Sequence, residues 1–216
     1  MLEKMNEFFD SRINGYEEHM LNNIESAQEF YPFTASLLPT FPSSKILDLG
    51  CGTGLELDYY FKVNPSAQVT GIDLASGMLE VLNRKHHDKE LRLINGSYFD
   101  IPFPINYYDA CVSVESLHHF TENDKCKLYE KVFNSLKTGG YFILTDYFAK
   151  DNEYEEKFMN ELSRLKKEQS VTDNEFYHYD TPLTVDHETR ALQIGGFSKI
   201  EVINNWGATY TIRATK

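Results

Sequence analysis

The sequence lacks the features that mark secreted and membrane-spanning proteins. It has three cysteines among 216 residues, an odd number at wide spacings, which favours reduced thiols over a disulfide framework. No apolar run approaches the roughly 20 residues that cross a bilayer. The first ten residues are acidic and polar, so they do not predict a signal peptide. We therefore expect a cytoplasmic protein that does not interact with a membrane.

Positive charge is also scarce. Lys and Arg number 21 against 33 Asp and Glu, for a net charge of -12. A protein that binds nucleic acid needs a basic stripe to meet the phosphates, and the sequence shows none. The length and the 41% hydrophobic content suit one globular domain. We therefore expect a small-molecule substrate, no nucleic acid, and either a monomer or a homodimer.

A glycine-rich turn dominates the remaining pattern. Residues 45–54 read KILDLGCGTG, which predicts a short buried strand followed by three glycines at alternate positions. Residues 55–62 then have helical spacing, so helix amides and a bare backbone can approach a ligand closely. Dinucleotide-binding turns use Gly-x-Gly-x-x-Gly, whereas Leu55 stands here where the third glycine would fall. The spacing disfavours a nicotinamide oxidoreductase.

The segment 48–54, DLGCGTG, resembles the first motif of the class I S-adenosylmethionine-dependent methyltransferases. The resemblance implies a Rossmann-like, doubly wound α/β fold, with a seven-stranded, mainly parallel sheet, an antiparallel C-terminal hairpin and a helical cap. It implies S-adenosyl-L-methionine as the cofactor, with a loop around its methionine end and a carboxylate near its ammonium group. The residues that this motif would supply are Asp48, Gly50, Cys51, Gly52 and Gly54.

Two later segments extend the predicted cofactor site. The strand 68–73 ends in Asp73, whose carboxylate could accept both hydroxyls of a ribose beside the first turn, or could instead cap the helix that follows. The family pattern places Leu74 and Met78 beside the adenine. A third strand, 91–95, leads to Ser97 where the family often has an aspartate, so we expect the Ser97 hydroxyl and the Tyr98 backbone at the adenine edge.

Candidate catalytic residues follow the fourth and fifth strands, 109–115 and 141–147. Parallel strands present their carboxyl ends to one crevice, so the ends of these strands should meet the N-terminal Tyr16 there. Glu115 and His119 could act as bases near neutral pH, with Tyr147 beside them, although the sequence does not separate His118 from His119. Both histidines could instead pack or cap the next helix. We expect no metal site, because adjacent side chains should point apart.

The flanking segments predict helices and a terminal hairpin. Tyr16 would close over the cofactor, or simply pack. The predicted helices cover 14–31, 32–38, 121 to the glycines 139–140, 154–167 and 184–194, and the predicted hairpin joins strands 199–203 and 208–213. The aromatic run 176–179 could line a pocket or pack. We expect one domain, 1–216, divided into an N-terminal helical cap (1–40), a cofactor-binding core (45–150), an inserted cap (151–183) and a C-terminal helix with hairpin (184–216).

The predicted activity is methyl transfer from S-adenosyl-L-methionine to a small-molecule acceptor. Two alternatives remain open at this point. A carboxy-S-adenosylmethionine synthase has a similar capped architecture, but it needs an arginine where alignment places Ala191, with Arg190 one residue early. One residue turns a helical side chain by about 100°. A non-catalytic module that binds S-adenosylmethionine is the other alternative.

Overall fold

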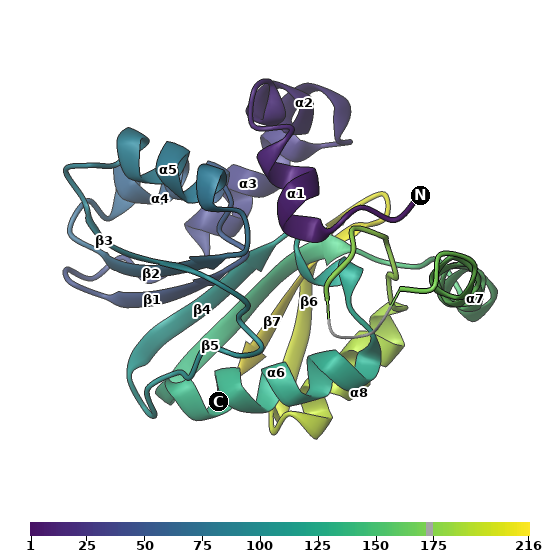
Figure 1. The fold of residues 1–216 in the computed structure, drawn as a ribbon. Coiled ribbons are helices and arrows are strands. Elements are labelled where there is room, and N and C mark those ends of the chain that lie inside the picture. Colours follow the sequence, from purple (N-terminus) through teal and green to yellow (C-terminus); the bar gives the residue numbers. More distant parts are fainter. Residues whose placement is uncertain (172–174) are drawn as a thin grey trace.

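A single mixed sheet of seven strands organises the protein. The computed structural model describes residues 1–171 and 175–216, and its strands lie in the order β3-β2-β1-β4-β5-β7-β6 (Figure 1). Strands β1 to β5 are parallel, whereas β7 runs antiparallel to both β5 and β6. The predicted fold class is confirmed. The strands are Lys45–Leu49, Gln68–Asp73, Glu90–Asn95, Tyr108–Val114, Leu136–Tyr147, Lys199–Trp206 and Thr209–Thr215, from β1 to β7.

Helices cover both faces of the sheet, and each face has its own apolar core. α3 (Ala27–Ser36) packs against α4 (Leu55–Val63) on the face that also carries α5 (Ser76–Lys85), while α6 (Glu122–Ser135) packs against α8 (Val185–Ile194) on the other (Figure 1). Because side chains alternate along a strand, Ile46 of β1 joins one core and Leu47 joins the other. The order reverses between β1 and β4, which opens a crevice at their carboxyl ends.

The N-terminal region differs from the prediction. In place of helices at 14–31 and 32–38, the chain forms α1 (Met5–Asp10), α2 (Tyr16–Asn23) and α3. The predicted long helix breaks at Ser26, which has a left-handed backbone with φ 59°. Pro32 lies inside α3 rather than at the start of a new helix. The helical spacing of apolar residues continues from α2 into α3, because both helices bury residues in the same core.

The predicted end of α6 is also wrong. The capping box at Thr121 is present, but the helix ends at Ser135, and Gly139 and Gly140 belong to β5. Leu136 pairs with Tyr108, so the strand begins before the glycines. A register shift between Tyr108 and Ala110 takes up the irregularity that the glycines create.

The inserted segment after β5 contains α7 (Asn152–Glu168), which buries none of its residues and projects beside the sheet (Figure 1). It is tied back by polar contacts: Glu155 accepts a hydrogen bond from the Thr184 amide at 2.6 Å and pairs with His187 at 2.8 Å. Residues 172–174 of the predicted inserted cap lie outside the described part of the chain. None of the helices within the described residues has both the length and the apolar character needed to cross a bilayer.

Candidate active site

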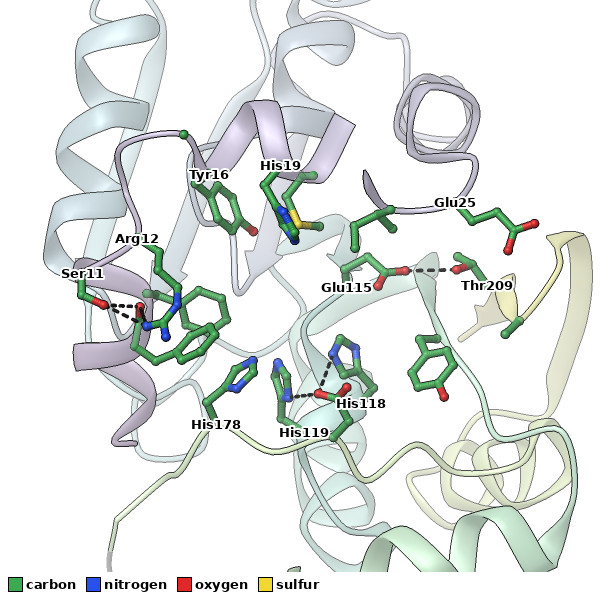
Figure 2. Close-up of a pocket in the computed structure, with 18 of the residues that line it drawn as sticks. Ser11, Arg12, Tyr16, His19, Glu25, Glu115, His118, His119, His178 and Thr209 are labelled. Atoms are coloured by element: carbon green, nitrogen blue, oxygen red, sulfur yellow. Dashed lines mark hydrogen bonds and ion pairs between the residues drawn. The ribbon is translucent and has the colours of Figure 1, made fainter. Parts of the chain in front are cut away.

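Two adjoining hollows lie at the carboxyl ends of β1 and β4. The larger is a cavity of about 800 Å³, and the smaller is a recess of about 50 Å³ beside the glycine turn. Phe9, Tyr16, Glu115 and His119 line both (Figure 2). The cavity has the size of a small-molecule site, whereas the recess could hold little more than a water molecule in this conformation.

The glycine turn is held in a conformation that ordinary residues avoid. Gly50, Gly52 and Gly54 have φ values of 71°, 48° and 74°. The Gly50 amide donates to the Ile72 carbonyl at 2.8 Å, and the Gly52 amide donates to Asp73 Oδ2 at 2.8 Å. These bonds fix the end of β1 against the end of β2.

Asp73 occupies the predicted place beside the turn. Its second oxygen accepts a hydrogen bond from the Ala75 amide at 2.8 Å, which fixes the carboxylate to the loop that leads into α5. Burial raises the pKa of Asp73, and the amides of Ala75 and Gly52 partly oppose that shift. Asp73 lines the recess, and its binding of a ribose stays a prediction; the N-cap of α5 is Ala75 rather than Asp73.

A pair of buried carboxyl groups lies beneath the turn. Asp48 and Glu56 are 1% and 4% exposed, and among the described residues Asp48 Oδ2, Glu56 Oε1 and Thr53 Oγ1 lack hydrogen-bond partners. Burial raises the pKa of both carboxyl groups, and the charge of Glu56 raises that of Asp48 further. Sequence reasoning missed Glu56, whose only signal was an acidic residue in the first turn of a predicted helix.

The other predicted cofactor residues divide between the recess and its surroundings. Cys51 and Gly54 do not line the recess, and the Ser97 hydroxyl accepts a hydrogen bond from the Phe99 amide at 3.1 Å. Tyr98 lines the recess, and its carbonyl accepts a hydrogen bond from Lys131 Nζ at 2.8 Å. The predicted cofactor residues that line the recess are Tyr16, Gly50, Gly52, Asp73, Leu74, Met78, Tyr98 and Glu115.

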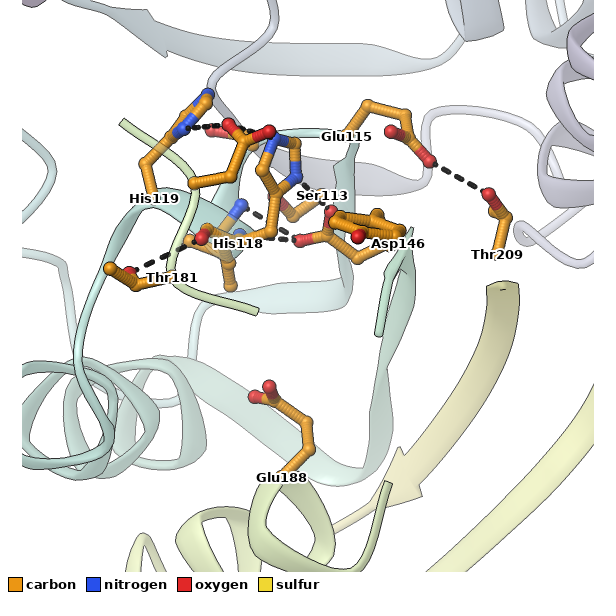
Figure 3. Close-up of polar contacts among 12 residues, drawn as sticks. Ser113, Glu115, His118, His119, Asp146, Thr181, Glu188 and Thr209 are labelled. Atoms are coloured by element: carbon orange, nitrogen blue, oxygen red, sulfur yellow. Dashed lines mark hydrogen bonds and ion pairs between the residues drawn. The ribbon is translucent and has the colours of Figure 1, made fainter. Parts of the chain in front are cut away.

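The two adjacent histidines lie side by side. A short 3-10 helix, Leu117–His119, brings their ring centroids within 4.0 Å, so the expectation that they point apart is wrong. His118 Nδ1 lies 2.5 Å from Asp146 Oδ1 on β5 (Figure 3). Burial lowers the pKa of His118, but Asp146 overrides it and raises that pKa to about 9. Burial and the neighbouring His118 both lower the pKa of His119.

The remaining candidate catalytic groups face the same cavity. Glu115 has a left-handed backbone with φ 49°, and Thr209 Oγ1 lies 3.4 Å from its carboxyl group. Burial, with the charge of Asp146, raises the pKa of Glu115 to about 8. Tyr147 lines the cavity with its hydroxyl 2.8 Å from that of Tyr154 on α7. The structure thus brings together Tyr16, Glu115, His119 and Tyr147.

Two segments that are distant in the sequence close the cavity together. The Met5 amide donates to the Phe176 carbonyl at 2.9 Å, and the His178 amide donates to the Glu3 carbonyl at 3.0 Å. Sequence reasoning noted the aromatic run at 176–179 but missed α1, which carries Phe9, and it missed Asp180. The adjacent apolar residues Phe8 and Phe9 lie in a helix of six residues, which is too short for the sequence to show where it packs.

Comparisons with known proteins agree on one family. A family model described as a methyltransferase domain matches residues 47–144. A fatty-acid O-methyltransferase from Mycolicibacterium smegmatis is 34% identical over 102 residues, which are 47% of this chain and 36% of that protein. A carboxy-S-adenosyl-L-methionine synthase from Nautilia profundicola is 23% identical over 227 residues, covering 100% of this chain and 96% of that protein.

Solved structures share the fold. A phosphoethanolamine N-methyltransferase 2 from Haemonchus contortus, solved with S-adenosyl-L-methionine, superposes with a TM-score of 0.68 at 21% identity, covering 93% of this chain and 44% of that one. This chain spans only part of several relatives: the matched segment covers between 29% and 64% of the length of the mycobacterial protein and two other curated relatives.

Proposed function

Because this chain belongs to the class I S-adenosylmethionine-dependent methyltransferases, whose cofactor is S-adenosyl-L-methionine, we propose that it transfers the methyl group to a small-molecule acceptor. The observation that carries this proposal is the glycine turn of β1 with Asp73 beside it, lining a recess that adjoins the large cavity. The division into a core, two caps and a C-terminal hairpin is part of the same proposal.

The residues around the turn fit the cofactor. The free side of Gly52 meets only the Tyr16 hydroxyl, at 3.9 Å from where a Cβ would stand, so a ligand can approach the backbone there. The unpartnered oxygens of Asp48 and Glu56 put negative charge below the position proposed for a cationic ammonium group. Met5 and Phe9 of α1 line the recess, and its small volume means that they must give way when a nucleoside enters.

The cofactor supplies a sulfonium-activated methyl group, so the protein has chiefly to hold an acceptor in line with it, an effect worth roughly 7–11 kcal/mol. We propose that the acceptor occupies the 800 Å³ cavity, where Glu115 and His119 can take its proton. Glu115, with its pKa near 8, and His119, with a lowered pKa, bracket neutral pH. Tyr16 and Tyr147 also line the cavity, and aromatic side chains there suit a sulfonium ion.

The rival function of a carboxy-S-adenosylmethionine synthase gains support from the full-length match to the Nautilia protein. The arginine needed for it is not supplied by Arg190, which forms two hydrogen bonds of 2.6 Å with Glu122 and does not line the cavity. Mass spectrometry of the ligand that co-purifies separates the two functions. Carboxy-S-adenosylmethionine in the preparation would favour the rival.

Calorimetry on the purified protein tests the cofactor. We expect micromolar binding of S-adenosylmethionine and S-adenosylhomocysteine, and none of NAD. Asp73→Ala should weaken that binding about 10- to 100-fold, since hydrogen bonds to a charged group contribute roughly 1.5–3 kcal/mol. The exposed Asp88 provides a matched control, Asp88→Ala, which should bind as the wild type does. Equal affinity in Asp73→Ala would remove this residue from the site, and absence of binding by the wild type would sink the proposal.

Release of S-adenosylhomocysteine distinguishes an enzyme from a non-catalytic binding module. The loaded protein is incubated with a small-molecule extract of cells, and the demethylated product is measured by mass spectrometry. We expect product to accumulate with the wild type and to fall sharply with Glu115→Gln. If no S-adenosylhomocysteine accumulated with any extract, a non-catalytic binding module would be favoured.

The affinity for S-adenosylmethionine should rise with pH. Burial raises the pKa of Asp48 and of Glu56, so at a given acidic pH more of this pair is protonated than in exposed carboxyl groups, and the protonated form attracts the cationic cofactor less. As pH rises through the raised pKa, the pair ionises and binding tightens. Calorimetry at several pH values measures how the affinity for S-adenosylmethionine changes with pH. Asp73, whose pKa is also raised, contributes to that dependence. Asp48→Asn should flatten it, and an unchanged slope would remove Asp48 from this role.

A further inference from the structure

Three ligand-type side chains converge at the wall of the cavity, outside the glycine turn. Asp180 Oδ1 lies 3.2 Å from His119 Nδ1 and 3.7 Å from His118 Nε2, and the three ligand atoms all lie within 4.8 Å of one another. Ligand atoms around a tetrahedral metal ion, at about 2.0–2.2 Å from it, stand roughly 3.3 Å apart. The observed separations therefore need only small side-chain shifts to enclose an ion.

The contacts behind His118 support a ligand role. Metal-binding histidines usually donate their other ring N–H to a carboxylate, which fixes the tautomer. His118 Nδ1 has such a partner in buried Asp146, at 2.5 Å (Figure 3). Its Nε2 is left on the side of Asp180, 3.7 Å from Asp180 Oδ1. Asp146 is itself held by the amides of Leu117 and His118, at 2.8 and 3.0 Å.

A second grouping, Glu115 with His118 and Asp146, is the weaker candidate. Both oxygens of Asp146 already accept hydrogen bonds, from His118 Nδ1 and the Tyr147 amide on one side and from two further amides on the other. An ion there would have to displace these bonds. In contrast, Asp180 is 42% exposed at its side chain and is free to turn toward an ion.

The charges around the two rings also favour a cation. Asp146, Asp180 and Glu115 surround the imidazoles of His118 and His119 within this small region. A divalent ion would offset that negative charge. His119 would give up only a long contact, 3.3 Å, between its Nδ1 and the Tyr179 carbonyl.

We propose that His118, His119 and Asp180 form a binding site for a divalent transition-metal ion of the Zn²⁺ type, with its fourth position open to the cavity. Three protein ligands and one open position are the arrangement of a site that can bind a further molecule. With the ion present, His119 holds metal, and Glu115 is the base left for the reaction proposed above. An acceptor oxygen or sulfur in the cavity can then bind the ion.

Metal titration of the stripped protein tests the site without any cofactor. Protein treated with a chelator is titrated with Zn²⁺ by calorimetry and with Co²⁺ by visible spectroscopy, because the Co²⁺ spectrum reports the ligands and their geometry. We expect one equivalent to bind at micromolar or lower Kd, with a four-coordinate Co²⁺ spectrum. Asp180→Asn and His119→Ala should each weaken binding at least tenfold.

The His187–Glu155 pair provides a matched control, because it also joins a histidine and a carboxylate at 2.8 Å but belongs to no group of three possible metal ligands among the described residues. His187→Ala should leave the Zn²⁺ affinity and the Co²⁺ spectrum unchanged. Circular dichroism checks that each variant is folded, and partly exposed Asp180 is the position where substitution disturbs the fold least. Absence of stoichiometric binding, or binding that survives both Asp180→Asn and His119→Ala, would overturn the site. S-adenosylmethionine binding, measured separately, keeps this outcome distinct from failure of the proposed function.

Discussion

Replacing Gly50 by alanine is expected to lower the free energy of unfolding by about 3 kcal/mol and to abolish detectable binding of S-adenosylmethionine. A Cβ at this position would stand 2.0 Å from Ser116 Oγ and 2.6 Å from Ser116 Cβ. The serine hydroxyl could rotate away, but its Cβ is fixed to the backbone. The left-handed φ of 71° adds strain for any side chain. Urea unfolding and calorimetry measure the two effects.

Gly139 provides the control for backbone strain alone. Its φ is 78°, and a Cβ there would have no atom within 4 Å. Gly139→Ala should therefore cost only about 1 kcal/mol and leave cofactor binding intact. Adding Ser116→Gly to Gly50→Ala removes the clashing atoms and should recover part of the lost stability. If Gly50→Ala and Gly139→Ala lowered the free energy of unfolding equally, the contact with Ser116 would not be destabilising.

Replacing Lys125 by methionine is expected to cost about 3–5 kcal/mol of stability, because it leaves the Glu188 carboxylate buried without its cation. Lys125 Nζ lies 2.6 Å from Glu188 Oε2, and the two side chains are 2% and 1% exposed. Tyr129 also donates a hydrogen bond to Glu188, but a hydroxyl does not balance a buried charge. The pair joins α6 to α8, so its loss loosens the packing of these two helices on their face of the sheet.

A double variant and a surface pair complete this experiment. Lys125→Met combined with Glu188→Leu removes both charges, and it should regain most of the stability, since apolar replacements of buried ion pairs are often neutral. Arg190 and Glu122 join the same two helices at the surface, where the Arg190 side chain is 52% exposed. Arg190→Ala should cost no more than about 1 kcal/mol. A Lys125→Met protein as stable as the wild type would contradict the stabilising role of this ion pair.

The strands of the sheet were readable from the sequence because their signals are local. The alternation of apolar residues and the turn glycines predicted β1 and α4, and Gln68–Asp73 was predicted with the bounds that the structure has. Asp73 was placed beside the turn because a crossover of known length returns the chain to the neighbouring strand. The same reasoning failed at Gly139 and Gly140, where pairing with β4 overrode the usual meaning of two glycines after a helix.

The cap could not be predicted in the same way. Periodicity does not show where a helix breaks, so Ser26 was missed, and it does not show where a short helix such as α1 packs. The Asp48–Glu56 pair also escaped notice, because eight positions in the sequence separate two side chains that meet only when the turn folds back. These features depend on packing rather than on local propensity.

By itself, the sequence determined the fold class, the glycine turn and the family, because each follows from spacing within about thirty residues. Only the tertiary structure decided what surrounds the reacting centre. The contacts of His118 and His119 with Asp180 and the bond of Lys125 to Glu188 join residues about sixty positions apart. No local pattern records such contacts, since the side chains are brought together by the sheet and by the inserted segment that folds back over it. Carboxylates and imidazoles acquire their shared charge and shifted pKa values only when that packing removes them from water.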